Sequence, residues 1–267
     1  MGNVRARVRA TSKPLLGVIG IAVLWHAPLR AQRDGSPSTH FPLTAHDVVR
    51  NLEERNRARG QALHGFEGTR IYSLHYRGFP HNYDAEMVVS LAYQAPASKE
   101  FTVVSQSGSK FIIERVFKKM LDSEKEAGQE QSRSALSEQN YEFTLAGQEE
   151  TPEGARYILS VTPKSKNKFL YRGKVWIDAT DFAVVKIEAQ PAQNPSFWIK
   201  KTDIRHSYKK VNDFWLPAEN HSQSFIRIGG HADLSIEYRD YRITGADPLP
   251  APPSRAYDAA SKPATTE

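Results

Sequence analysis

The hydrophobic positions between residues 157 and 190 follow the pattern of a β-meander. Three runs rich in β-branched and aromatic residues, at 157–161, 169–177 and 182–187, are separated by the polar clusters at 163–167 and 178–181. Such runs favour strands, and clusters of Pro, Ser, Asn and Asp favour turns. Connections this short join neighbouring strands in antiparallel order. The stretch therefore predicts three strands of one antiparallel sheet.

Each of these strands is predicted to have one apolar face. Val175 and Ile177 alternate with largely polar neighbours, and Val185 and Ile187 do the same on either side of Lys186. Successive side chains of a strand point to opposite faces of its sheet. The apolar face must be buried against helices, against another sheet or around a ligand, and the alternation leaves these three arrangements open.

Similar alternation predicts the rest of the sheet. In the run at residues 64–76, Tyr72, Leu74 and Tyr76 share one face of a predicted strand. The other runs with strand character lie at residues 85–93, 101–106, 141–145, 197–208, 222–228 and 232–243. With the meander, the sequence predicts about ten strands in one continuous domain. The predicted fold class is α+β with mainly antiparallel β-structure, and a curled sheet of this kind leaves a groove or cavity on its concave side.

Two segments have helical periodicity instead. Thr44 and Asp47 form a capping-box pattern that predicts the start of a helix, and Gly60 predicts its end. The second helix is predicted at 111–127, where one broad apolar face is formed by Ile112, Ile113, Val116, Phe117, Met120 and Leu121.

The two ends of the chain are predicted to lie outside the folded domain. Residues 1–31 combine basic residues, an uncharged run at 14–25 and a small-residue site near Ala31, which is the pattern of a cleaved secretory signal peptide. An uncleaved N-terminal anchor is the alternative. Residues 32–43 are predicted to be a polar linker, and the Pro/Ala/Ser-rich segment 245–267 a disordered tail.

Charge and cysteine content narrow the function classes. The leader carries five basic residues and no acidic one, so without it the formal net charge of +6 becomes +1. A nearly neutral protein has no strong electrostatic reason to bind nucleic acid. The chain has no cysteine, which excludes disulfides, thiolate catalysis and a lipid anchor on cysteine. An export signal without cysteine indicates a periplasmic location.

A search for catalytic or metal-binding motifs finds none. The chain has no phosphate-binding loop, no dinucleotide fingerprint, no nucleophile elbow and no zinc-protease helix. Its nine histidines lack the spacing of metal ligands. Asp178 and Asp181 could form an acid/base pair, but their place at a hairpin end favours turn chemistry. The sequence therefore predicts no enzyme, no cofactor and no metal site.

Several segments together resemble a known family. The hairpin at 171–178 and 181–188, with sequence YRGKVWID and DFAVVKIE, resembles that of the outer-membrane lipoprotein-sorting (LolA/LolB/RseB/LppX-like) superfamily. Further matches are Ala95-Pro96 before Lys99-Glu100-Phe101, Ser107-Gly108-Ser109, Trp215-Leu216-Pro217 and the helix that starts at Thr44. The resemblance covers residues 44–243.

The resemblance implies an unclosed, half-open β-barrel over residues 44–244, in which helices cover the concave side and form a lid over a cavity for acyl chains. The wall of this cavity is expected to consist of Met87, Val89, Leu91, Tyr93, Phe101, Val103, Tyr141, Phe143, Val175, Ile177, Val185 and Ile187. The expected lid residues are Ile112, Val116, Phe117 and Met120. One position departs from the family: Thr102 stands where the lipoprotein carrier has an arginine that hydrogen-bonds the lid.

The first functional hypothesis is a monomeric periplasmic carrier of envelope lipoproteins or lipids, which receives its cargo from an inner-membrane donor and delivers it to an outer-membrane acceptor. The second is an envelope-stress sensor or scaffold that resembles RseB and reports bound lipoprotein to a membrane partner. The third is an enzyme acting on envelope lipids, for which no residue pattern gives support. The receptor role is disfavoured because the chain lacks a lipid-anchor cysteine.

Overall fold

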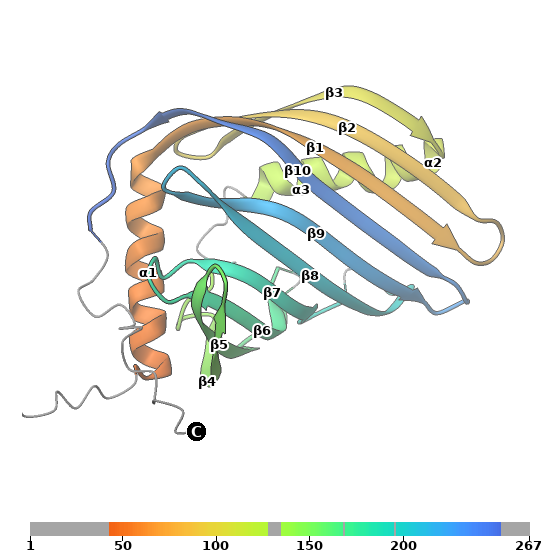
Figure 1. Ribbon diagram of the computed structural model, residues 1–267. Helices are drawn as coiled ribbons and strands as arrows, with labels where there is room; N and C mark the ends of the chain where they lie inside the picture. The colour runs from red at the N-terminus through yellow and green to blue at the C-terminus, as the bar shows by residue number, and fades with distance from the viewer. Residues whose placement is uncertain (1–42, 128–134, 168, 195, 252–267) are drawn as a thin grey trace, which may run out of the picture. The chain divides into compact units, whose positions relative to one another are not determined.

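Figure 1 shows the computed structural model, which describes residues 43–127, 135–167, 169–194 and 196–251. The predictions for residues 1–42 and 252–267 lie outside the described residues. The helical elements are α1 (Ala45–Ala62), α2 (Lys110–Ile112), η1 (Ile113–Phe117) and α3 (Lys118–Ala127). The strands are β1 (Leu63–Arg77), β2 (Tyr83–Gln94), β3 (Ser98–Gly108), β4 (Tyr141–Thr151), β5 (Gly154–Pro163), β6 (Tyr171–Asp178), β7 (Val184–Pro191), β8 (Ile199–Val211), β9 (Phe214–Ile226) and β10 (His231–Ala246).

The ten strands form one antiparallel sheet in the order β3-β2-β1-β10-β9-β8-β7-β6-β5-β4. The edge strands β3 and β4 are not paired with each other in the described structure, so the sheet is not closed. This confirms the predicted fold class, a mainly antiparallel sheet of about ten strands with few helices. The strand β10 continues to Ala246, two residues into the segment that was expected to be disordered.

One row of directly paired residues runs across the sheet and defines its concave face. Paired residues of antiparallel strands place their side chains on the same face. From β2 to β4 this row consists of Ala85, Leu74, Leu234, Ser222, Ile204, Ala189, Gly173, Val161 and Phe143. Residues two positions away on each strand extend the same face, and all the helices pack against it.

Helix α1 covers the end of the sheet formed by β4 to β7. It begins with the predicted capping box, in which the Thr44 side chain accepts from the Asp47 amide while Asp47 contacts the Thr44 amide. The helix passes the predicted end at Gly60 and continues to Ala62, because the chain enters β1 directly at Leu63, whose amide donates to Arg59 O. Val48, Val49 and Leu52 of α1 are fully buried against β5, β6 and β7.

A buried arginine fixes α1 to the β6–β7 turn. The guanidinium of Arg59 donates to the carbonyl oxygens of Asp181 and Phe182 at 2.9 and 2.8 Å. Phe182 has a φ of 46° and is fully buried, so this turn depends on its surroundings to hold an unfavourable backbone conformation. Burial lowers the pKa of Arg59 to about 10, and the guanidinium stays charged at neutral pH.

The second helical segment, residues 110–127, is called the cover helix here and consists of α2, η1 and α3. The sequence predicted one α-helix, and the structure confirms the helix but inserts a π-helical turn at Ile113–Phe117. Ile112, Ile113, Phe117 and Leu121 pack against the concave face of β1, β2 and β10. Figure 1 shows α1 and the cover helix at different parts of the sheet. Neither the cluster beneath α1 nor the cluster beneath the cover helix contains a residue of β9 in the described structure, and the middle of the concave face lies between them. A third cluster, near the start of β1, includes Phe214 and Leu216 at the beginning of β9.

Candidate functional site

An apolar cavity of about 880 Å³ lies in the middle of the concave face. Its volume falls within the range of about 300–1,000 Å³ that is usual for small-molecule sites. The cover helix contributes Ile112, Val116 and Met120 to one wall. The sheet contributes apolar residues from β1, β8, β9 and β10, namely Leu74, Tyr76, Ile199, Ile204, Ile226, Ala232, Leu234 and Ile236. Within the described part of the chain, no charged residue lines this cavity.

A short row of uncharged polar side chains crosses the floor of the cavity on β8 and β9. Thr202, Asn220, Ser222 and Ser224 all line it. Thr202 and Ser224 are directly paired in the sheet, and their hydroxyl oxygens lie 2.9 Å apart in a hydrogen bond. The cavity can therefore hold an apolar chain along its walls and form hydrogen bonds to an uncharged polar group at its floor.

The structure separates the residues that the sequence assigned to a single cavity wall. None of the twelve wall residues lines the 880 Å³ cavity. Met87 and Val89 are buried beneath the cover helix, and Leu91, Tyr93 and Phe101 belong to a cluster near the start of β1. Tyr141, Phe143, Val175, Ile177 and Ile187 are packed beneath α1. Val103 is exposed on β3, and Val185 lies in a separate polar pocket.

The predicted lid residues are closer to the cavity. Ile112, Val116 and Met120 line it, whereas Phe117 is fully buried and contacts Tyr72 with ring centroids 5.7 Å apart. The β8–β9 floor was not recognised from the sequence, because its alternating positions include Ser, Thr and Asn, which resemble the solvent-facing positions of a strand. The alternation of Tyr72, Leu74 and Tyr76 was the available signal for this face.

Buried charges attach the far end of the cover helix to the sheet. Arg70 of β1 donates to both carboxylate oxygens of Glu124 on α3, at 2.5 and 3.0 Å, and Lys99 of β3 donates to the same carboxylate at 2.6 Å. Burial alone would raise the pKa of Glu124, but the bonds from Arg70 and Lys99 outweigh it and lower the pKa to about 2. Thr102 is exposed on β3, and the ionic contact between the sheet and the cover helix comes from Arg70 and Lys99.

His206 lies next to the cavity floor, where it is directly paired with Asn220. Its ring stacks on Tyr208 with centroids 4.6 Å apart, and its Nε2 is buried without a hydrogen-bond partner in the described structure. Burial, reinforced by the charge of Arg70, lowers the pKa of His206 to about 4. The imidazole is therefore neutral at pH 7 and adds no charge to this region.

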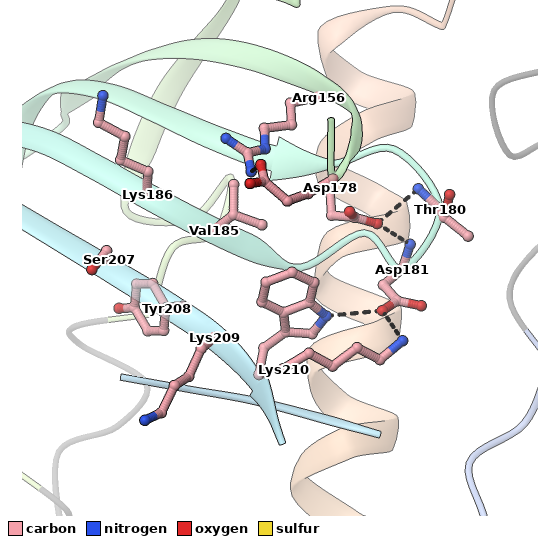
Figure 2. A pocket seen from close by; sticks show the side chains of 12 residues that line it. Arg156, Asp178, Thr180, Asp181, Val185, Lys186, Ser207, Tyr208, Lys209 and Lys210 are labelled. Atoms are coloured by element: carbon pink, nitrogen blue, oxygen red, sulfur yellow. Dashed lines mark hydrogen bonds and ion pairs between the residues drawn. The ribbon is translucent and has the colours of Figure 1, made fainter. Parts of the chain in front are cut away.

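A second, polar pocket of about 720 Å³ lies around the β6–β7 turn, and Figure 2 shows its side chains. Asp178 accepts from the amides of Thr180 and Asp181, at 2.9 and 2.6 Å, which confirms its predicted role in the turn. The carboxylate of Asp181 accepts from Trp215 Nε1 at 2.9 Å and from Lys210 at 2.6 Å. Burial acts to raise the pKa of Asp181, but these two bonds lower it overall, so this carboxylate is ionised and engaged in structural contacts.

Among residues 43–127, 135–167, 169–194 and 196–251, no group of three or more His, Asp or Glu side chains is placed to hold a metal ion. In the same ranges, no helix has the length and apolar character that a bilayer crossing requires.

No protein-family model and no curated protein matches the chain. Among solved structures, it is similar to an outer membrane lipoprotein-sorting protein domain from Vibrio parahaemolyticus, with 12% identity, a TM-score of 0.38 and coverage of 75% of this chain and 93% of that chain. A LolA superfamily protein from Nitrosomonas europaea is 11% identical to this chain, with a TM-score of 0.33 and coverage of 78% of this chain and 96% of that chain. For the MucA/MucB complex of Pseudomonas aeruginosa, the identity is 11%, the TM-score is 0.25, and the match covers 76% of this chain and 99% of that chain.

These structures include the superfamily that the sequence motifs resemble.

Proposed function

We propose that this protein is a periplasmic carrier that holds the acyl chains of an envelope lipid or lipoprotein in the cavity beside the cover helix, without covalent catalysis. The observation that supports this function is the apolar cavity of about 880 Å³ with no charged residue among its described lining residues. A fold that only needed a core would fill such a space with its own side chains, because protein interiors are close-packed.

The hydrophobic effect is sufficient for reversible binding in such a cavity. Each methylene transferred from water to apolar surroundings contributes about 0.8 kcal/mol, so a run of about ten methylenes contributes roughly 8 kcal/mol. This gross value corresponds to a micromolar complex before the cost of association is subtracted. A ligand held in this way can be released without breaking a covalent bond, as a carrier requires.

The test is direct binding of an acyl ligand by the purified protein. A fluorescent fatty acid is titrated into the wild type, and native mass spectrometry identifies any lipid that remains bound after purification. Ile204→Asn places an amide in the middle of the cavity floor, and we expect it to weaken probe binding at least about tenfold, since a buried polar group without a partner is unfavourable.

Ile71→Asn is the matched control. Ile71 lies on β1 with its side chain on the opposite face of the sheet, paired with Val88. The substitution Ile71→Asn makes the same chemical change outside the cavity and therefore controls for a general loss of stability. Thermal unfolding of both variants measures that loss. If the wild type binds neither probe nor cellular lipid, or if both variants bind the probe equally well, the carrier proposal is wrong. Recovery of a membrane protein without any lipid would instead favour the sensor role.

A further inference from the structure

Four large apolar side chains are exposed around the mouth of the cavity. Phe79 in the β1–β2 loop is 71% exposed, Phe111 at the start of α2 is 61% exposed, and both Trp198 before β8 and Ile228 in the β9–β10 turn are 57% exposed. All four line the cavity. They are called the rim here, and they come from four separate segments of the chain.

Hydrogen bonds and ring contacts hold the rim segments together. The Tyr76 hydroxyl donates to Phe79 O at 2.7 Å and lies 3.3 Å from Gly229 O, which connects the β1–β2 loop to the β9–β10 turn. The Arg227 amide donates to Trp198 O at 2.8 Å, which connects the same turn to the segment before β8. Tyr83 and Phe111 contact each other with centroids 6.3 Å apart. The rim is therefore a built surface and not four independent loop tips.

Basic residues predominate in the segments that carry the rim. The loop segments 78–83, 107–111, 192–200 and 225–231 contain Lys110, Lys200 and Arg227 and no aspartate or glutamate. Two exposed carboxylates close to these segments are paired with basic side chains, Asp84 with Arg77 at 2.8 Å and Glu114 with Lys118 at 2.6 Å. Exposed Trp and Phe beside basic residues is the combination found where proteins contact the headgroup region of bilayers.

We infer that the rim docks on the surface of a lipid bilayer that carries anionic headgroups, with the rim side chains placed at the level of the acyl chains. Contiguous exposed apolar surface indicates an interaction site, and its continuity with an apolar cavity selects lipid as the partner. Docking holds the mouth of the cavity against the hydrocarbon region. A lipid chain could then move between bilayer and cavity without crossing water. This inference concerns the rim and goes beyond the proposed acyl binding in the cavity.

Vesicle flotation tests the docking. The protein, in the form recovered from cells, is mixed with vesicles of phosphatidylcholine alone or of phosphatidylcholine with phosphatidylglycerol. We expect stronger binding to the anionic vesicles and an at least about tenfold weaker partition for the double variant Phe79→Ser/Trp198→Ser, because two apolar contacts with the bilayer are removed. Lys110→Gln/Lys200→Gln is expected to weaken binding only to the anionic vesicles.

Val104→Ser is the control for a general loss of surface hydrophobicity. Val104 is 64% exposed on β3 and does not line the cavity. Every variant keeps the same N-terminal segment, so any contribution of that segment cancels in the comparison. Equal vesicle binding by the wild type and the rim variant, or an equal loss in Val104→Ser, would overturn the inference, and a rim that bound a protein partner but no vesicle would do the same.

Fluorescence provides a readout that does not depend on the folding of the double variant. Trp198 of the wild-type protein should be quenched by lipids brominated in their acyl chains, and the single variant Trp198→Phe should lose this quenchable component. No quenching difference between the two proteins would contradict the docking. If docking fails, the titration with the fluorescent fatty acid still tests acyl binding independently. The variant Ile204→Asn changes the cavity floor and not the rim, so we expect it to bind vesicles normally while binding the fatty-acid probe more weakly.

Discussion

Replacing Glu124 by glutamine tests the ionic contact that attaches the cover helix to the sheet. The wild-type carboxylate receives two bonds from Arg70 and one from Lys99, and the Arg70 side chain is only 7% exposed. Glutamine preserves the shape of the side chain but supplies one acceptor oxygen and no charge. The variant therefore leaves a buried guanidinium without its counter-ion.

The magnitude follows from the pKa of Glu124, which is about 2 in the fold against an ordinary value of 4.5. A difference of this size corresponds to about 3 kcal/mol of stability. The folded pKa is the lower one, so this contribution is fully present above about pH 4.5 and is lost as the pH falls toward 2. We expect Glu124→Gln to lower the free energy of unfolding by about 2–3 kcal/mol at pH 7.

Urea unfolding at a series of pH values measures this loss. The difference between wild type and variant should shrink between pH 4.5 and 2, because a protonated glutamate resembles glutamine. The control is Glu114→Gln in the same helical segment, where an exposed pair with Lys118 at 2.6 Å is broken. Exposed pairs four residues apart on a helix contribute about 0.3–0.5 kcal/mol. If the two variants lose equal stability, or if the loss at Glu124 is independent of pH, the buried contact does not stabilise the helix as reasoned.

Three further predictions concern other parts of the fold. Burial lowers the pKa of His206 to about 4, so protonation destabilises the fold as the pH falls below 6.5, and His206→Gln should remove that part of the pH dependence between 6.5 and 4 in thermal unfolding. Gly173→Ala should destabilise the sheet by at least about 2 kcal/mol in urea unfolding, because an added Cβ would lie 2.1 Å from Glu188 O. Thr44→Ala should cost about 1 kcal/mol in the same assay through loss of the capping box with Asp47, and an unchanged midpoint would show that the cap contributes nothing.

Alternation in the sequence predicted the antiparallel sheet and most of the buried face of its meander, although Val185, predicted beside Ile187, lies in the polar pocket. Val175, Ile177 and Ile187 were predicted to lie on one apolar face, and the structure places all three in the same buried cluster. The capping box at Thr44 likewise marked the start of α1 correctly. Both results follow from local rules, since side-chain alternation and capping depend on residues a few positions apart.

The position of the cavity could not be obtained in the same way. Alternation shows which residues face the concave side, but it does not show which helix covers which strands. The predicted wall residues therefore include Met87 beneath the cover helix and Val175 beneath α1. The uncovered floor contains Ser222 and Ser224, whose small polar side chains are typical of solvent-facing positions. To locate the cavity, one must know which strands α1 covers and which strands the cover helix covers.

The hydroxyl and amide groups on the cavity floor determine how the empty cavity is solvated. A cavity lined only by apolar side chains would offer water no hydrogen-bond partners and would stay dry. Thr202, Ser222 and Asn220 instead offer anchoring points for water. A ligand that places an uncharged polar group against these side chains keeps their hydrogen bonds, whereas hydrocarbon that displaced the water would lose them.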